Sequence, residues 1–226
     1  TPDVLSDCTA DLAMTLLLMV ARRAGEGERE IRSGSWSGWR PPPRRGSKVT
    51  GKTLGIVGFG RIGQAMAQRA HHGFGMKIVV HNRSPIKQAI LKRYNATQVA
   101  TLDDLLPQSD FVSLHCPGGA ENRHLINNRR LELMKPEAFL INTARGEVID
   151  EYALAQSLMF GCIGGAGLDV YQGEPKISSH LLQCDNLVVL PHLGSASTET
   201  RNEMGNRVFQ NLIEFFNGRE PLDKVA

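Results

Sequence analysis

Three polar side chains with the chemistry to act on a carbonyl compound lie in the second half of the chain. Arg145, Glu174 and His192 each come shortly after an apolar, strand-like run of residues. In open α/β sheets, ligands bind beyond the carboxyl ends of the strands, so polar residues that follow strands are the first candidates for a site. We therefore expect an arginine, a carboxylate and a histidine at one edge of a sheet.

These three residue types suit the reduction of a 2-keto acid. Arg145 can bind a substrate carboxylate through two hydrogen bonds and polarise the keto oxygen. His192 can give a proton to that oxygen as a hydride arrives from a nicotinamide, while Glu174 would stabilise the imidazolium and fix the ring. Each residue also has a plainer interpretation: a surface ion pair, a turn residue before proline and a loop histidine. The placement of all three after strands favours the catalytic interpretation.

A glycine-rich turn supplies the expected nicotinamide site. An apolar run at 53–58 leads into the pattern Gly-x-Gly-x-x-Gly at Gly58, Gly60 and Gly63, and a helix-forming run follows. Gly58 permits a tight turn, Gly60 lets a pyrophosphate approach the backbone, and Gly63 lets the helix pack closely on the strand. The helix N-terminus then offers free N–H groups to the phosphates. The alternative is a strand–helix turn that binds no ligand.

The residues after the second predicted strand favour NADPH over NADH. A fold of this kind usually carries an acidic residue about 20 positions after the turn, where it binds the ribose 2′-hydroxyl. That place is taken by Asn82, which is followed by Arg83 and Ser84. A carboxylate would repel a 2′-phosphate, whereas Arg83 could pair with it and Ser84 could donate a hydrogen bond. In a plainer interpretation, Ser84 and Pro85 cap the next helix.

From residue 53 onward, strand-like and helix-like runs alternate. This alternation predicts an α/β fold, a Rossmann-type doubly wound parallel sheet. The predicted strands are 53–58, 76–81, 110–115, 138–142, 164–168 and 187–190. The predicted helices are 62–72, 85–93, 102–106, 129–134, 150–160 and 198–217. The last helix is amphipathic, and its apolar residues are expected in the core or in a dimer interface: Val208, Leu212, Phe215 and Phe216.

The N-terminal part predicts a linking helix and an irregular arm. Residues 7–24, with Asp7 or Thr9 as the cap, have the apolar spacing of a mostly buried helix. Residues 33–46 are rich in glycine, proline and arginine and contain two tryptophans. We expect this arm to pack on another surface, such as a second subunit.

The composition argues against several classes of protein. The formal net charge of +3 is small and scattered, so nucleic-acid binding is not expected. No apolar run approaches the roughly 20 residues that span a bilayer. The four cysteines form no Cys-x-x-Cys pair and the histidines show no metal spacing. We expect no metal, no membrane contact and a cytoplasmic protein with reduced thiols.

Four separated motifs occur at 58–63, 140–146, 167–175 and 191–195. In order and spacing they closely resemble the D-isomer-specific 2-hydroxyacid dehydrogenases, and within that family the glyoxylate and hydroxypyruvate reductases. The resemblance implies that the catalytic residues are Arg145, Glu174 and His192. It also implies an NAD(P)H-dependent enzyme that reduces a small 2-keto acid to the D-2-hydroxy acid. Several of these reductases use NADPH, which agrees with the preference inferred above.

The resemblance adds further contacts to the cofactor site. Asp169 would receive the nicotinamide carboxamide. The complete candidate site for NADPH or NADH comprises Gly58, Gly60, Arg61, Ile62, Gly63, Asn82, Arg83, Ser84, Cys116, Pro117, Thr143, Ala144, Asp169 and Gly194.

The domain organisation of the family implies a division of this chain. Residues 1–50 correspond to a linking helix and a dimer arm, 51–217 to the dinucleotide-binding domain and 218–226 to a C-terminal tail. The substrate domain of the family comes mostly from an N-terminal segment, which we expect to be largely absent. We therefore predict that the chain binds the cofactor but turns over poorly alone.

The resemblance also implies two partners. One is a small 2-keto or 2-hydroxy acid, and the other is a second copy of the chain, bound through the first helix and the arm that carries Trp36 and Trp39. A competing hypothesis is a non-catalytic module that binds a dinucleotide and dimerises or acts as a sensor. The presence of all three catalytic residue types favours an enzyme.

Overall fold

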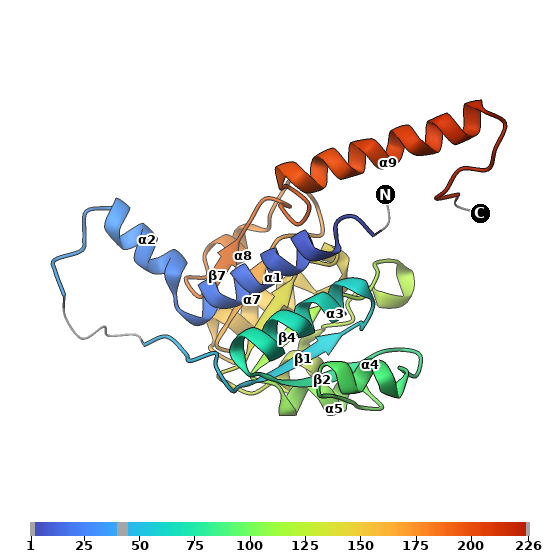
Figure 1. Ribbon diagram of the computed structural model, residues 1–226. Helices are drawn as coiled ribbons and strands as arrows, with labels where there is room; N and C mark the ends of the chain where they lie inside the picture. Colours follow the sequence, from blue (N-terminus) through green and yellow to red (C-terminus); the bar gives the residue numbers. More distant parts are fainter. Residues whose placement is uncertain (1–2, 40–44, 225–226) are drawn as a thin grey trace.

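The computed structural model describes residues 3–39 and 45–224. Within these ranges, seven parallel strands form one sheet with the order β3-β2-β1-β4-β5-β6-β7 (Figure 1). The strands are β1 (Thr53–Val57), β2 (Lys77–His81), β3 (Ala96–Gln98), β4 (Phe111–Leu114), β5 (Phe139–Asn142), β6 (Gly165–Leu168) and β7 (Leu187–Val189). The strand order reverses between β1 and β4, as in doubly wound folds. The predicted Rossmann-type sheet is confirmed.

Helices cover both faces of the sheet over two apolar clusters. One face is covered by α1 (Ser6–Ala21), α3 (Arg61–Gln68) and α4 (Gln88–Arg93). The other is covered by α5 (Leu102–Leu105), α6 (Asn128–Glu132), α7 (Glu151–Met159) and α8 (Ser179–Leu182). Neighbouring residues of β1 belong to different clusters, with Ile56 in the first and Val57 in the second. Because both faces are buried, the strands other than the edge strand β3 appear in the sequence as mostly apolar runs.

The first helix packs on the sheet through small and aliphatic side chains. Ala10, Ala13 and Leu17 are fully buried at intervals of three and four residues, which places them on one side of α1. The predicted buried helix is confirmed, but it ends at Ala21 rather than at residue 24. Neither Asp7 nor Thr9 caps it, because the N-cap is Leu5 and makes no side-chain hydrogen bond.

A second helix, α2 (Ala24–Arg32), follows α1 and was not predicted. Arg23, with φ of +54°, separates the two helices. None of the residues of α2 is buried, so its sequence carries no apolar period that could have indicated a helix. Glu28 and Arg32 form an ion pair one turn apart. In Figure 1, α2 extends away from the sheet.

All six predicted strands are confirmed, with each end within one residue of its prediction. The edge strand β3 was not predicted, because Ala96, Thr97 and Gln98 form no apolar run. The helix predicted at 85–93 begins only at Gln88, after the N-cap Lys87. Ser84 and Pro85 therefore do not cap it.

The other predicted helices are confirmed with adjusted ends. The prediction at 62–72 corresponds to α3 and a π-helical turn, η1 (Arg69–Gly73), and that at 102–106 to α5 and a 3-10 turn, η2 (Leu106–Gln108). The predictions at 129–134, 150–160 and 198–217 correspond to α6, α7 and α9 (Thr198–Phe216). The four-residue helix α8 was not predicted.

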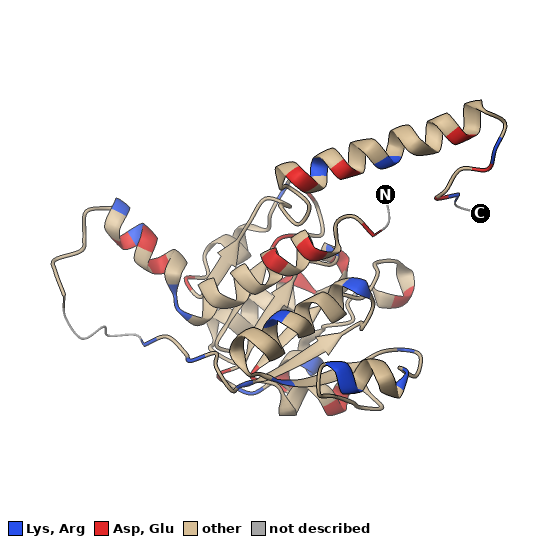
Figure 2. Ribbon diagram, in the orientation of Figure 1, with Lys and Arg blue, Asp and Glu red and all other residues tan. Residues whose placement is uncertain are grey.

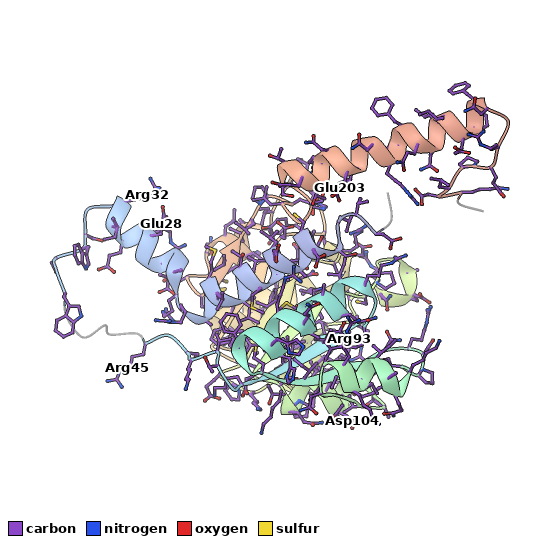
Figure 3. All side chains as sticks on the ribbon, viewed as in Figure 1. Glu28, Arg32, Arg45, Arg93, Asp104 and Glu203 are labelled. Carbon is purple, nitrogen blue, oxygen red and sulfur yellow. The ribbon has the colours of Figure 1, made fainter. Side chains whose placement is uncertain are left out.

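The last helix, α9, leaves its apolar side uncovered. Its side chains project into open space in Figure 3, and the helix extends beyond the sheet in Figure 1. Phe215 is 62% exposed and Phe216 79% exposed, with Val208 and Leu212 about half exposed. The expectation that these residues enter the core is wrong, because no element of the described chain packs over them. Their place in an interface stays a prediction.

Acidic and basic residues are distributed over most of the elements (Figure 2). In residues 3–39 and 45–224, no helix combines the length and the apolar character needed to cross a bilayer. The same ranges contain no group of three or more His, Cys, Asp or Glu residues arranged to hold a metal ion. The four cysteines are free thiols: Cys8, Cys116, Cys162 and Cys184.

Candidate active site

The glycine turn between β1 and α3 has the geometry of a dinucleotide site. Gly58 has φ of +90°, and a Cβ at Gly63 would lie 2.2 Å from the carbonyl oxygen of Gly58. Only glycine at position 63 therefore lets α3 approach the strand this closely. A Cβ at Gly60, by contrast, would meet no atom within 4 Å. Gly60 thus faces open space at a helix N-terminus, where a pyrophosphate fits.

A cavity of about 200 Å³ opens beside this turn, where the strand order reverses between β1 and β4. Ligands of doubly wound sheets bind at this reversal. The loops after β1, β2 and β4 bring six of the predicted cofactor contacts into its wall: Gly58, Asn82, Arg83, Ser84, Cys116 and Pro117. Burial raises the pKa of Cys116 to about 11, so this thiol is protonated and serves as wall rather than nucleophile.

The residues after β2 are held by hydrogen bonds and an ion pair. Asn82 Oδ1 accepts from the N–H of Phe59 at 3.1 Å, and Asn82 Nδ2 donates to the carbonyl of Ser84 at 3.0 Å. Asn82 thus ties the end of β2 to the glycine turn. The guanidinium of Arg83 pairs with Glu121, with 2.8 Å between Nη1 and Oε1.

The remaining predicted cofactor contacts lie outside this cavity. Arg61 and Ile62 are in the first turn of α3, and Arg61 pairs with Asp3. Thr143 and Ala144 follow β5. The hydroxyl of Thr143 is buried and has no hydrogen-bond partner within the described chain, so it is available to a bound ligand.

Asn142, the last residue of β5, shapes the loop that carries Arg145. Its Oδ1 accepts from the N–H of Ala144 at 2.9 Å, and its Nδ2 donates to the carbonyl of Arg145 at 3.0 Å. The side chain is only 1% exposed, and a buried amide bonded at both ends fixes the backbone around it. Arg145 is exposed and lies at the carboxyl edge of the sheet.

His192 and Glu174 come from different loops and form a hydrogen-bonded dyad. His192 Nδ1 lies 2.7 Å from Glu174 Oε2, and Glu174 Oε1 accepts from the N–H of Tyr171 at 3.0 Å. His192 has φ of +55°, and its side chain is 53% exposed. Because the carboxylate holds Nδ1, the second ring nitrogen, Nε2, is left to exchange a proton with a substrate.

The charge of Glu174 is stabilised in this arrangement. Burial acts to raise its pKa, but hydrogen bonds from His192 and from the N–H of Tyr171, with the charges of His192 and Arg145, hold the pKa below its usual value. The ionised carboxylate lies 2.7 Å from His192 Nδ1. The influence of Arg145 on Glu174 also brings the three predicted catalytic residues into one electrostatic site.

Asp169 anchors the loop that carries His192. Its Oδ1 accepts from the N–H of Leu193 at 2.7 Å and its Oδ2 from the N–H of Gly194 at 2.8 Å. Thr9 of α1 donates from its hydroxyl to the carbonyl of Gly194 at 3.0 Å. Burial raises the pKa of Asp169 in spite of its two backbone hydrogen bonds. The contact of Asp169 with a nicotinamide carboxamide stays a prediction beside this anchoring role.

Sequence reasoning missed three residues that position the site. Asn142 and Thr9 hold the loops described above, and the 9% exposed Glu151 accepts from the N–H of Gln172 at 2.6 Å, which fixes the loop before Glu174. For two of these residues, the sequence itself contains a pattern that could have indicated a positioning role. Asn142 is a polar residue that closes an apolar strand, and Thr9 lies in an apolar helix. Nothing in the local pattern distinguishes Glu151 from a solvated first-turn carboxylate.

His115 leads to a prediction about stability at acid pH. Its Nε2 lies 2.9 Å from Ser113 Oγ, and burial lowers its pKa to about 4. The unfolded chain binds the same proton with a pKa of about 6.5. As the pH falls from about 6.5 to about 4, the unfolded state takes up this proton and the folded state does not. The free energy of unfolding should therefore fall by up to about 3 kcal/mol across this interval.

Urea denaturation at a series of pH values measures this loss. His115→Gln is the informative variant, because its amide nitrogen can take the place of Nε2 beside Ser113 and does not titrate. The variant should lack this part of the pH dependence. Identical slopes for the two proteins would contradict the assignment to His115.

Residues 14–194 match the family model described as "D-isomer specific 2-hydroxyacid dehydrogenase, NAD binding domain". The chain is 48% identical over 229 residues to a glyoxylate reductase of Thermococcus litoralis, with all of this chain and 68% of the relative covered. It is 46% identical over 219 residues to glyoxylate/hydroxypyruvate reductase B of Klebsiella pneumoniae, with 96% and 67% covered. The chain thus spans about two thirds of the length of the curated relatives it matches.

Solved structures of similar proteins carry related descriptions and have the same fold. A putative D-isomer specific 2-hydroxyacid dehydrogenase from Polaromonas superposes with a TM-score of 0.95 at 40% identity, over all of this chain and 70% of that one. An NADPH-dependent glyoxylate/hydroxypyruvate reductase from Sinorhizobium meliloti, in complex with NADP and malonate, superposes with a TM-score of 0.91 at 38% identity, over all of this chain and 69% of that one.

Proposed function

We propose that this chain, which belongs to the D-isomer specific 2-hydroxyacid dehydrogenase family, carries the dinucleotide-binding and catalytic residues of an NAD(P)H-dependent 2-keto acid reductase. The proposed substrates are glyoxylate and hydroxypyruvate, and the product is the D-2-hydroxy acid. The observation that carries the proposal is the 2.7 Å contact between His192 and Glu174 at the sheet edge that also presents Arg145 and the glycine turn. The names of similar relatives support the choice of substrate.

The three catalytic residues divide the work on the substrate. Arg145 binds the carboxylate of the keto acid and draws electron density toward the keto oxygen. A bound reduced nicotinamide supplies the hydride. His192 gives the proton on Nε2 to the keto oxygen as the carbonyl becomes an alcohol. After the transfer the imidazole ring is neutral, with its Nδ1–H directed at Glu174. Glu174 stabilises the imidazolium before the transfer and holds the ring in one orientation throughout.

We propose NADPH as the preferred cofactor. The pyrophosphate would lie against Gly60 and the first turn of α3, and the 2′-phosphate would lie near Arg83 and Ser84. Support comes from Asn82, an uncharged residue at the end of β2 where NADH sites carry a carboxylate. A structurally similar enzyme is also described as NADPH-dependent and holds NADP.

Gly60→Ala tests the dinucleotide site without disturbing the fold. Gly60 has φ of −73° and ψ of −161°, which alanine adopts readily, and the added methyl meets no protein atom within 4 Å. The methyl would instead occupy the space of the pyrophosphate. We expect the Kd for NADPH in titration calorimetry to rise about tenfold or more, with an unchanged thermal midpoint.

Gly27→Ala is the matched control, because a Cβ at Gly27 of α2 also meets nothing within 4 Å and lies far from the turn in sequence. It should alter neither binding nor the fold. Undiminished NADPH binding by the Gly60→Ala protein would place the cofactor elsewhere. A wild-type chain that binds neither NADPH nor NADH would refute the proposed function.

Three further proposals concern the setting of this site. We propose a homodimer formed through the first helix and the following arm, supported by Trp36 at 56% and Trp39 at 90% exposure. We propose a cytoplasmic location, with which the free thiols agree. The division into residues 1–50, 51–217 and 218–226 is likewise proposed.

A further inference from the structure

We propose that Glu121 sets the preference of this chain between NADPH and NADH, because it competes with the 2′-phosphate for Arg83. The inference rests on the proposed dinucleotide site and adds a specificity-determining residue to it. Neither the sequence motifs nor the catalytic arrangement points to Glu121.

The ion pair between Arg83 and Glu121 spans the two loops that flank the cofactor cavity. Arg83 follows β2, and Glu121 lies in η3 (Ala120–Asn122), beyond β4. Their side chains meet with 2.8 Å between Nη1 and Oε1. Arg83 itself and Asn122, the neighbour of Glu121, both line the cavity beside the glycine turn. The pair therefore stands at the rim of the proposed adenosine end of the cleft.

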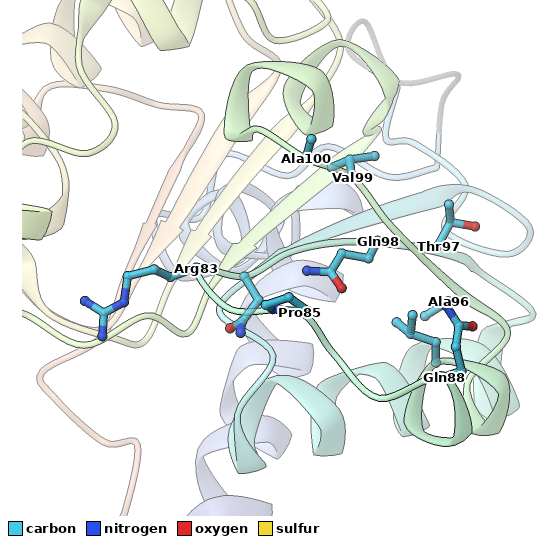
Figure 4. Close-up of a pocket in the computed structure, with 10 residues that line it drawn as sticks. Arg83, Pro85, Gln88, Ala96, Thr97, Gln98, Val99 and Ala100 are labelled. Carbon is cyan, nitrogen blue, oxygen red and sulfur yellow. The ribbon is translucent and has the colours of Figure 1, made fainter.

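Arg83 also belongs to a second, more open pocket of about 690 Å³, which is lined by β3, α4 and the residues that follow β2 and β3. Among the described residues that line this pocket, Arg83 is the only charged one. In Figure 4 its guanidinium points away from the other labelled side chains, such as Pro85 and Gln98. Glu121 thus pairs with the only charged side chain among the described residues that line this pocket.

Arg83 can exchange the carboxylate of Glu121 for a phosphate at little cost in free energy. The two side chains are 81% and 61% exposed, and exposed pairs contribute little to stability. A phosphate carries more negative charge than a carboxylate and offers three acceptor oxygens to a guanidinium. Glu121 must nevertheless give up its partner, and its charge remains near the phosphate. NADH, with a neutral 2′-hydroxyl, does not require this exchange.

Glu121→Gln keeps the size of the side chain and removes its charge. We expect the Kd for NADPH to fall about 3- to 10-fold and the Kd for NADH to change less than about twofold, both measured by titration calorimetry. The gain in affinity for NADPH should become smaller as salt is added, because the side chains of Arg83 and Glu121 are exposed to solvent. The matched control is Glu28→Gln on α2, labelled in Figure 3, which removes the same charge from the ion pair with Arg32 and should alter neither constant.

A double-mutant cycle separates competition for Arg83 from simple repulsion through space. Arg83→Gln should weaken NADPH binding, and Glu121→Gln should bring no gain in that background. Three results would overturn the inference and leave the proposed function standing. The first is that Glu121→Gln lowers the Kd for NADPH as much in the Arg83→Gln background as in wild type. The others are that Glu121→Gln lowers the Kd values for NADPH and NADH equally, or that it changes neither. Failure of the wild-type chain to bind either dinucleotide would overturn both.

Discussion

Replacement of His192 by glutamine is expected to lower the rate of keto acid reduction by about 10²- to 10⁴-fold, the usual contribution of general acid catalysis. Glutamine retains a hydrogen-bonding group near Glu174 but cannot deliver a proton at neutral pH. Because the ring is half exposed and belongs to no apolar cluster, the fold should be unaffected. The measurement is the initial rate of NADPH oxidation with glyoxylate and with hydroxypyruvate, with wild type and variant at equal concentration.

Glu174→Gln provides the comparison that identifies the role of the dyad. The amide can still accept from the N–H of Tyr171, but it no longer stabilises a positive charge on His192. We therefore expect a smaller loss of rate than in the His192→Gln protein, measured in the same assay.

One outcome would change the assignment. If the His192→Gln protein kept its rate within tenfold of wild type, the proton would come from another group. A wild type that binds NADPH and reduces neither acid would agree with the low turnover that we predict for this chain alone, and would not by itself favour a non-catalytic dinucleotide module.

The elements predicted best from the sequence are those that the sheet buries on both faces. β1 and β5 are largely apolar because all but the first residue of β1 and every residue of β5 are buried, and such runs are visible without any knowledge of the fold. α2 and β3 lack that signal. α2 buries none of its residues, and β3 lies at the edge of the sheet, so neither needs an apolar pattern.

The grouping of the candidate catalytic residues was predictable from the sequence. Arg145, Glu174 and His192 follow strands, and the rule that strand ends meet at one edge was sufficient to group them. Contacts between loops far apart in sequence were not predictable. The pairing of Arg83 with Glu121 spans 38 residues and depends on the relative placement of two loops. Asn82 illustrates the same limit, because its bond to the N–H of Phe59 depends on how β2 meets the glycine turn.

Gly146→Ala is expected to destabilise the protein by about 3 kcal/mol or more, which corresponds to a fall of roughly 6–12 °C in the thermal midpoint of a chain of this size. A Cβ at Gly146 would lie 1.9 Å from the carbonyl carbon of Tyr171 and 2.4 Å from the backbone nitrogen of Gln172. These are backbone atoms, so no side-chain rotation can relieve the overlap. One of the two loops must move.

The effect of Gly146→Ala on catalysis can be measured separately from its effect on stability. Gly146 follows Arg145, while Tyr171 donates its N–H to Glu174, so the close approach sets the distance between the two loops that carry these candidate catalytic residues. We expect the Gly146→Ala protein, assayed well below its thermal midpoint, to bind NADPH and to lose keto acid reduction. Gly205→Ala in α9 is the control, because its Cβ meets nothing within 4 Å and alanine favours a helix, so its midpoint should rise. A Gly146→Ala protein that melts and turns over like wild type would mean that the two loops are not in contact in solution, and the placement of Arg145 beside Glu174 would then lose its structural basis.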